Sequence, residues 1–145
     1  NNEPLFEIDP RQETIDSDIN YNILELSNDN VFLNTLRENW ITKMPNVLNV
    51  HIGPVASGAA VIADGDISKE IQKQCRKLIG IEMEAYGLIY AAKYSINPKP
   101  EPIVIKSVCD FADEHKNNDY QSYAAYTSAG FLYEFAKRYI DPLTN

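Results

Sequence analysis

The stretch Ile79–Ala92 reads IGIEMEAYGLIYAA, and its character changes in the middle. Its first part, Ile79–Met83, is a short apolar run typical of a buried strand, whereas the part from Glu84 onward has the composition of a helix. A strand that passes directly into a helix is the unit from which α/β domains are built. This stretch therefore predicts an α/β fold.

The same alternation extends on both sides of this stretch. Upstream, Val47–Ala56 (VLNVHIGPVA) reads as a strand, and Asp66 is placed to cap a helix that ends before Gly80. Downstream, Ile103–Val108 (IVIKSV) reads as a buried strand. The order of helix, strand, helix, strand, helix, strand and helix predicts a largely parallel sheet covered by helices.

The two ends of the chain have contrasting patterns. Residues 1–28 are polar and weakly periodic, so we expect an arm with at most a short helical turn or strand around Ile23–Leu26. Ser27–Asp29 offers capping oxygens for a helix that ends near Pro45 and has three large apolar residues on one face: Phe32, Leu36 and Trp40. The last helix, Tyr120–Ile140, should pack through side chains at helical spacing: Tyr123, Thr127, Phe131, Phe135 and Tyr139.

The composition limits the classes of function. The 145 residues suit one domain, and a net charge of −8 with a pI near 4.7 disfavours nucleic-acid and membrane-surface binding. Two cysteines, no long apolar run and no signal peptide predict a reduced, cytoplasmic protein. Because the chain opens with Asn1 rather than Met, we expect it to belong to a longer protein.

Polar side chains follow each of the three predicted strands. The first strand leaves through Ser57-Gly58, the second through Glu82-Met83-Glu84, and the third through Cys109-Asp110. Ligands of open α/β sheets bind at the carboxyl ends of the strands. The carboxylates of the second and third exits should therefore meet at one edge of the sheet.

Each of these residues also has a purely structural interpretation. Glu84 could be a first-turn acid that the helix dipole favours, and Asp110 could bond its own backbone in a turn. His51 should be a core residue within its strand, and His115 an exposed loop residue. Two histidines so far apart form no metal-binding motif, and no glycine-rich phosphate motif is present. We expect neither a metal nor a cofactor.

Three motifs, in order, resemble one superfamily. Glu82-Met83-Glu84 resembles the E-M-E signature of purine nucleoside phosphorylases and methylthioadenosine/adenosylhomocysteine nucleosidases. Residues 108–113 (VCDFAD) resemble the S-D-x-A-D loop of that superfamily, and residues 53–58 (GPVASG) resemble the strand and turn that lead to its base-binding residues. The segment from His115 to Ala125 resembles phosphorylase-like modules of multidomain signalling or defence proteins. The resemblance covers about residues 47–140.

The resemblance implies a role for several residues. Asp110 would be the catalytic acid that protonates the purine, and Glu84 would grip the ribose hydroxyls while Met83 packs on the sugar. Glu82 belongs to the same substrate-binding signature.

The sequence departs from the superfamily pattern around the base. Cys109 stands where the family often has serine, and Val61 and Ile62 stand where many nucleosidases have an aromatic residue that stacks on the base. These three positions are still expected to line the substrate site. The departures leave the base and the 5′ substituent open.

The resemblance implies a nucleoside-phosphorylase-like mixed sheet flanked by helices, incomplete in this chain. Residues 1–46 would form an arm and the first helix, and residues 47–140 the core that bears the motifs. Nothing before Val47 resembles the family's phosphate loop or its water-activating glutamate, so we expect this piece to be inactive alone.

The predicted function is cleavage of the N-glycosidic bond of a purine nucleoside or nucleotide, by phosphate or by water. The alternative is a nucleoside-binding sensor or interaction module of a larger signalling protein that has lost turnover. A flavodoxin-like receiver domain fits less well, because the acid cluster expected at its first strand is missing. An incomplete sheet would leave a strand edge open, so we also expect a homo-oligomer or further domains of the same protein.

Overall fold

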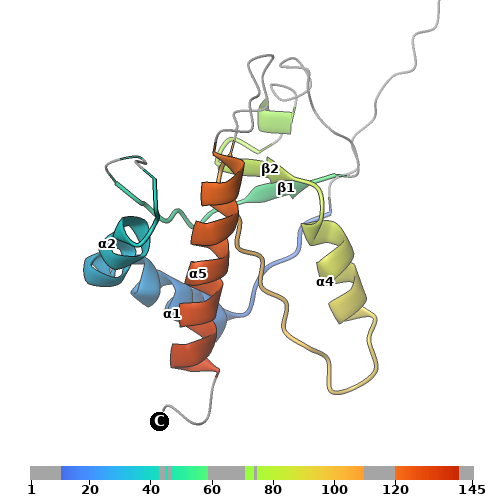
Figure 1. The fold of residues 1–145 in the computed structure, drawn as a ribbon. Helices are drawn as coiled ribbons and strands as arrows, with labels where there is room; N and C mark the ends of the chain where they lie inside the picture. The colour runs from blue at the N-terminus through green and yellow to red at the C-terminus, as the bar shows by residue number, and fades with distance from the viewer. Residues whose placement is uncertain are drawn as a thin grey trace, which may run out of the picture.

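The computed structural model describes residues 11–42, 45, 47–58, 71–73, 75–109 and 120–140. Apart from the helical residues 71–73, the described residues form four helices and two short strands, and their order along the chain is seen in Figure 1. The helices are α1 (Ser17–Ser27), α2 (Asn30–Glu38), α4 (Ala85–Lys93) and α5 (Gln121–Tyr139). The strands are β1 (Val55–Ser57) and β2 (Gly80–Glu82).

The core of the described chain lies between α1, α2 and α5. Its buried members come from all three helices: Ile23, Leu26, Leu33, Phe131 and Phe135. In Figure 1, α1 and α2 lie beside α5, while α4 stands apart from it. Helices from the two ends of the chain therefore form the central packing unit.

α5 confirms the predicted helical face. Tyr123, Thr127, Phe131 and Phe135 are all buried, as their spacing of four residues predicts. Tyr139, the last member of the series, packs against the core and is partly buried.

The N-terminal part is more helical than its composition suggests. α1 occupies Ser17–Ser27, where an arm was expected, because Asp16 caps it by accepting the amide hydrogens of Asp18 (2.8 Å) and Ile19 (3.3 Å). α2 begins after Asp29, the last residue of the predicted capping stretch Ser27–Asp29, but it ends at Glu38, well before Pro45.

The sheet of the described residues has two parallel strands, β1 and β2, with Ser57 in register with Glu82. The predicted strand Val47–Ala56 is wrong over most of its length. Pro54 has no amide hydrogen to donate and contributes only its carbonyl, which accepts the amide hydrogen of Ile79 at 2.9 Å, so the strand itself starts at Val55. His51 is exposed rather than buried in the core.

Residues 101–109 contain no strand, contrary to the prediction for Ile103–Val108. Ile103 and Ile105 instead pack against the helical core. The hydroxyl groups of Ser107 and Thr127, 2.8 Å apart, join this segment to α5. Helices combined with a small parallel sheet agree with part of an α/β fold.

The helix predicted after Asp66 lies mostly outside the described residues. Its described part, residues 71–73, is helical.

Candidate functional site

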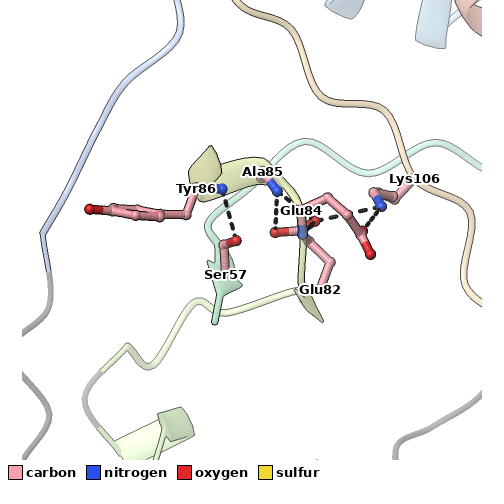
Figure 2. A network of polar contacts seen from close by, with 6 residues as sticks. All are labelled: Ser57, Glu82, Glu84, Ala85, Tyr86 and Lys106. Carbon is pink, nitrogen blue, oxygen red and sulfur yellow. Dashed lines mark hydrogen bonds and ion pairs between the residues drawn. The ribbon is translucent and has the colours of Figure 1, made fainter. Parts of the chain in front are cut away.

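The candidate site lies where β1 and β2 end and α4 begins. The amide of Gly58 donates to the carbonyl of Glu82 at 3.1 Å, so the two strands stay paired up to their carboxyl ends. α4 starts three residues later at Ala85. Figure 2 shows the polar side chains that gather at this junction.

Glu82 satisfies the first amides of α4. Its carboxylate accepts the amide hydrogen of Glu84 at 2.8 Å and that of Ala85 at 2.9 Å and 3.0 Å. The first amide groups of a helix have no partner within the helix, and a carboxylate near them also interacts favourably with the helix dipole. Glu82, which is 8% exposed, therefore fills the structural role that was considered for Glu84.

Glu84 does not cap the first amides of α4. It occupies the N-cap position of α4, but its side chain makes no capping hydrogen bond and is 70% exposed. Its carboxylate instead pairs with the ammonium group of Lys106. The same ammonium lies 3.6 Å from Oε2 of Glu82. Lys106 comes from the segment that Ser107 anchors to α5.

Neighbouring groups at the junction shift the pKa values of Glu82 and Lys106. Burial by itself would raise the pKa of Glu82, but the Ser57 hydroxyl, the amides of Glu84 and Ala85 and the charge of Lys106 together bring that pKa below its ordinary value. The hydrogen bond to Glu84 raises the pKa of Lys106. Glu82 and Lys106 are therefore both charged at neutral pH.

Ser57 joins β1 to α4. Its Oγ accepts the amide hydrogen of Tyr86 at 2.9 Å. The Ser57 hydroxyl, in register with Glu82 across the strand pair, also lowers the pKa of the Glu82 carboxyl.

The structure describes four of the seven predicted site residues. Glu82, Met83 and Glu84 lie together at the junction, and Met83 is 41% exposed beside Glu84. Cys109 is half-buried at the end of the segment that contains Lys106. The predicted acid Asp110 and the predicted base-lining residues Val61 and Ile62 lie outside the described residues.

Sequence reasoning missed two members of this junction, Ser57 and Lys106, as functional residues. Lys106 is the one charged residue in the run Ile103–Val108, and a charge inside an apolar run is a signal that could have drawn attention to it. Ser57 was noted only as part of a strand exit, and nothing in its local sequence shows that it contacts Glu82.

The arrangement offers a solvent-exposed carboxylate on a fixed backbone beside an ammonium group. The two oxygens of a carboxylate can accept hydrogen bonds from two neighbouring hydroxyl groups, as on a sugar. In the described part of the chain, no group of three His, Cys, Asp or Glu side chains could hold a metal ion. Among the same residues, no helix is long and apolar enough to cross a membrane.

Comparison with known proteins gives three relatives. The chain is 36% identical to the uncharacterized protein y4jS of Sinorhizobium fredii over 138 residues, which make up 94% of this chain and 33% of y4jS. It is 33% identical over 87 residues to a death domain-containing ATP nucleosidase of Amphimedon queenslandica, covering 59% of this chain and 16% of that protein. It is 32% identical over 79 residues to a nucleotide-binding leucine-rich repeat (NLR)-like protein of Hyaloscypha variabilis, covering 54% of this chain and 7% of that protein.

The chain thus spans about a third of the length of y4jS and smaller shares of the other two relatives. No family model matches the chain. No solved structure matches it significantly. The two partial relatives with descriptive names point loosely to a nucleosidase-type domain.

Proposed function

We propose that this chain contributes the sugar-binding carboxylate and the base-protonating acid to a site that cleaves the N-glycosidic bond of a purine nucleoside or nucleotide. Glu84 would bind the ribose hydroxyls and Asp110 would protonate the base. The nucleoside-phosphorylase-like fold, with further strands and the nucleophile-binding residues supplied from outside residues 1–145, is part of this proposal.

The observation that carries the proposal is the division of labour between two glutamates. Glu82 is buried and accepts hydrogen bonds from the first amides of α4. Glu84 is exposed and points away from these amides toward Lys106. A carboxylate with a fixed backbone, no capping role and open solvent access is available to a ligand. Its place after a parallel strand is where α/β domains bind their ligands.

The proposed chemistry uses each group once. As the bond between C1′ of the ribose and N9 of the purine breaks, its electron pair moves to the base and positive charge builds on the sugar. The Glu84 carboxylate favours that charge, and a proton from Asp110 to N7 makes the base a better leaving group. Water or hydrogen phosphate then adds to C1′ through oxygen, and the proton that it releases restores the acid form of Asp110.

The relative named ATP nucleosidase supports this reaction class and favours a nucleotide among the candidate substrates. A second candidate function is a nucleotide-binding module without turnover within a larger signalling protein. Its support is the NLR-like relative, of which this chain matches only 7%.

The test is release of free purine from adenosine, methylthioadenosine, inosine and ATP by the full-length protein, each with and without phosphate. Dependence on phosphate identifies a phosphorylase, and its absence a nucleosidase. Asp110→Asn should lower the rate by about 10²–10⁴-fold with little change in affinity, because the proton acts in the transition state. Glu84→Gln should weaken both binding and rate.

The matched control is Glu38→Gln. Glu38 is also a largely exposed carboxylate, 66% accessible, in an ion pair with the neighbouring Arg37, but it lies at the end of α2. This variant should keep the wild-type rate. If the protein binds a nucleoside, releases no base from any of the four compounds and is unaffected by Asp110→Asn, the binding module replaces the enzyme.

A further inference from the structure

Glu82 leaves little of its carboxylate for a ligand. Oε2 accepts the amides of both Glu84 and Ala85, Oε1 accepts the amide of Ala85, and Lys106 lies 3.6 Å away. The side chain is 8% exposed. A sugar hydroxyl would have to displace these partners to reach it.

Ser57 completes the same arrangement from the neighbouring strand. A serine hydroxyl has one proton to donate and lone pairs to accept. Here the oxygen accepts the amide hydrogen of Tyr86 at 2.9 Å. Figure 2 shows Ser57 and Glu82 on adjacent strands, both directed at the start of α4.

Three consecutive amides, those of Glu84, Ala85 and Tyr86, are therefore held by two side chains. The two side chains are themselves in register across the parallel pair, Ser57 opposite Glu82. The backbone of Glu84 is thus tied to both strands, while its side chain projects to the ion pair with Lys106.

We propose that Ser57 and Glu82 are positioning residues that fix the backbone of Glu84, and that Glu82 does not itself contact the sugar. This assignment rests on the proposed function of Glu84. It replaces the substrate contact that the E-M-E resemblance suggests for Glu82. Displacement of a catalytic group by about 1 Å can cost about 10²-fold in rate, so loss of the positioning contacts should lower kcat more than it changes KM.

The test compares Ser57→Ala with Ser57→Thr in the full-length protein. Alanine removes the hydroxyl, whereas threonine keeps it on a residue well suited to a strand. We expect Ser57→Ala to lower kcat about 10- to 100-fold with less than about a threefold change in KM, and Ser57→Thr to restore the rate. If Ser57→Ala does not fold, Glu82→Gln, which keeps the shape but loses the charge, takes its place with Glu82→Ala as the comparison.

A role in stability alone would lower the melting temperature of Ser57→Ala and leave kcat unchanged well below that temperature. That result would overturn the proposal, as would a rate that threonine does not restore.

Failure of the proposed function is a separate result. If the wild-type protein releases no base, the two Ser57 variants are compared by NMR, through hydrogen exchange at Tyr86 and the backbone order parameter of Glu84. Faster exchange and lower order in the alanine variant, both reversed by threonine, support the positioning role. Unchanged values reject it.

Discussion

Asp29 connects the two ends of the helical core, and its removal gives a quantitative test of the packing. One carboxylate oxygen caps α2 by accepting the amide hydrogen of Phe32 at 2.9 Å. The other accepts a hydrogen bond from Nη1 of Arg138 on α5 at 2.8 Å, across 109 positions of sequence. The Phe32 amide and then the Arg138 guanidinium hold the pKa of Asp29 below its ordinary value of 3.8.

The two contacts can be separated by substitution. Asp29→Asn keeps a capping oxygen and loses the charge, so it should cost about 0.5–1 kcal/mol, the value of a partly exposed ion pair. Asp29→Ala loses the cap as well, which is worth about 1 kcal/mol more. The total for alanine is therefore about 1.5–2 kcal/mol.

Urea unfolding of the wild type and both variants measures these differences, and Arg138→Gln with the double variant isolates the pair. The ionised carboxylate stabilises the fold, so its contribution is present above about pH 4 and is lost as the pH falls through the lowered pKa. Equal costs for asparagine and alanine would show that the cap contributes nothing. If the double variant loses as much stability as the two single variants together, the ion pair contributes nothing.

Other predictions concern the helices and the site junction. Gly87→Ala should stabilise the protein by about 0.5–1 kcal/mol, because a Cβ there meets nothing within 4 Å, whereas the matched Gly130→Ala would place its Cβ 2.5 Å from Cδ1 of Leu36 and should lose that gain in the same thermal unfolding assay. Phe135→Ala should cost about 3–5 kcal/mol in urea unfolding, because Phe135 is 2% exposed in the core; a cost below 1 kcal/mol would contradict the described packing. Glu82→Gln should destabilise the fold at pH 6 but progressively less toward pH 3, because the lowered pKa of Glu82 makes the ionised form the stabilising one above its ordinary pKa of 4.5. A difference that stays constant with pH would contradict this.

The elements that sequence predicted well are those whose pattern is local. α5 has large side chains every four residues, and β2 and α4 follow each other in one continuous stretch of sequence. α1 was missed because acids and asparagines surround its few buried residues, Ile23 and Leu26. The capping aspartate before it, Asp16, was the signal that could have revealed it.

Strand predictions failed where hydrogen-bonding partners elsewhere in the chain determine whether a strand forms. Val47–Ala56 and Ile103–Val108 both have strand-like composition, but composition reports burial and not hydrogen bonding to a neighbour. Pro54 limits the length of the strand in the first run, and the isoleucines of the second run pack on helices. In both cases, the apolar, β-branched run correctly predicted contact with the core. In neither case did the predicted strand form over its full length.

The junction could be predicted only in part for the same reason. The order of the strands placed Glu82, Met83 and Glu84 at a strand exit. Which glutamate would cap the helix depends on the conformation of the turn, and the partnership with Lys106 depends on a segment 22 positions away. Neither can be read from local spacing.

The placement of the core across the two ends of the chain has a consequence for synthesis. Leu26 and Leu33 leave the ribosome about a hundred residues before Phe131 and Phe135, which cover them. At about 5–20 residues per second, this leaves the first two helices without their partner for about 5–20 s. During that interval the apolar faces of α1 and α2 lack the helix that covers them in the folded chain, and exposed apolar surface of this kind favours aggregation.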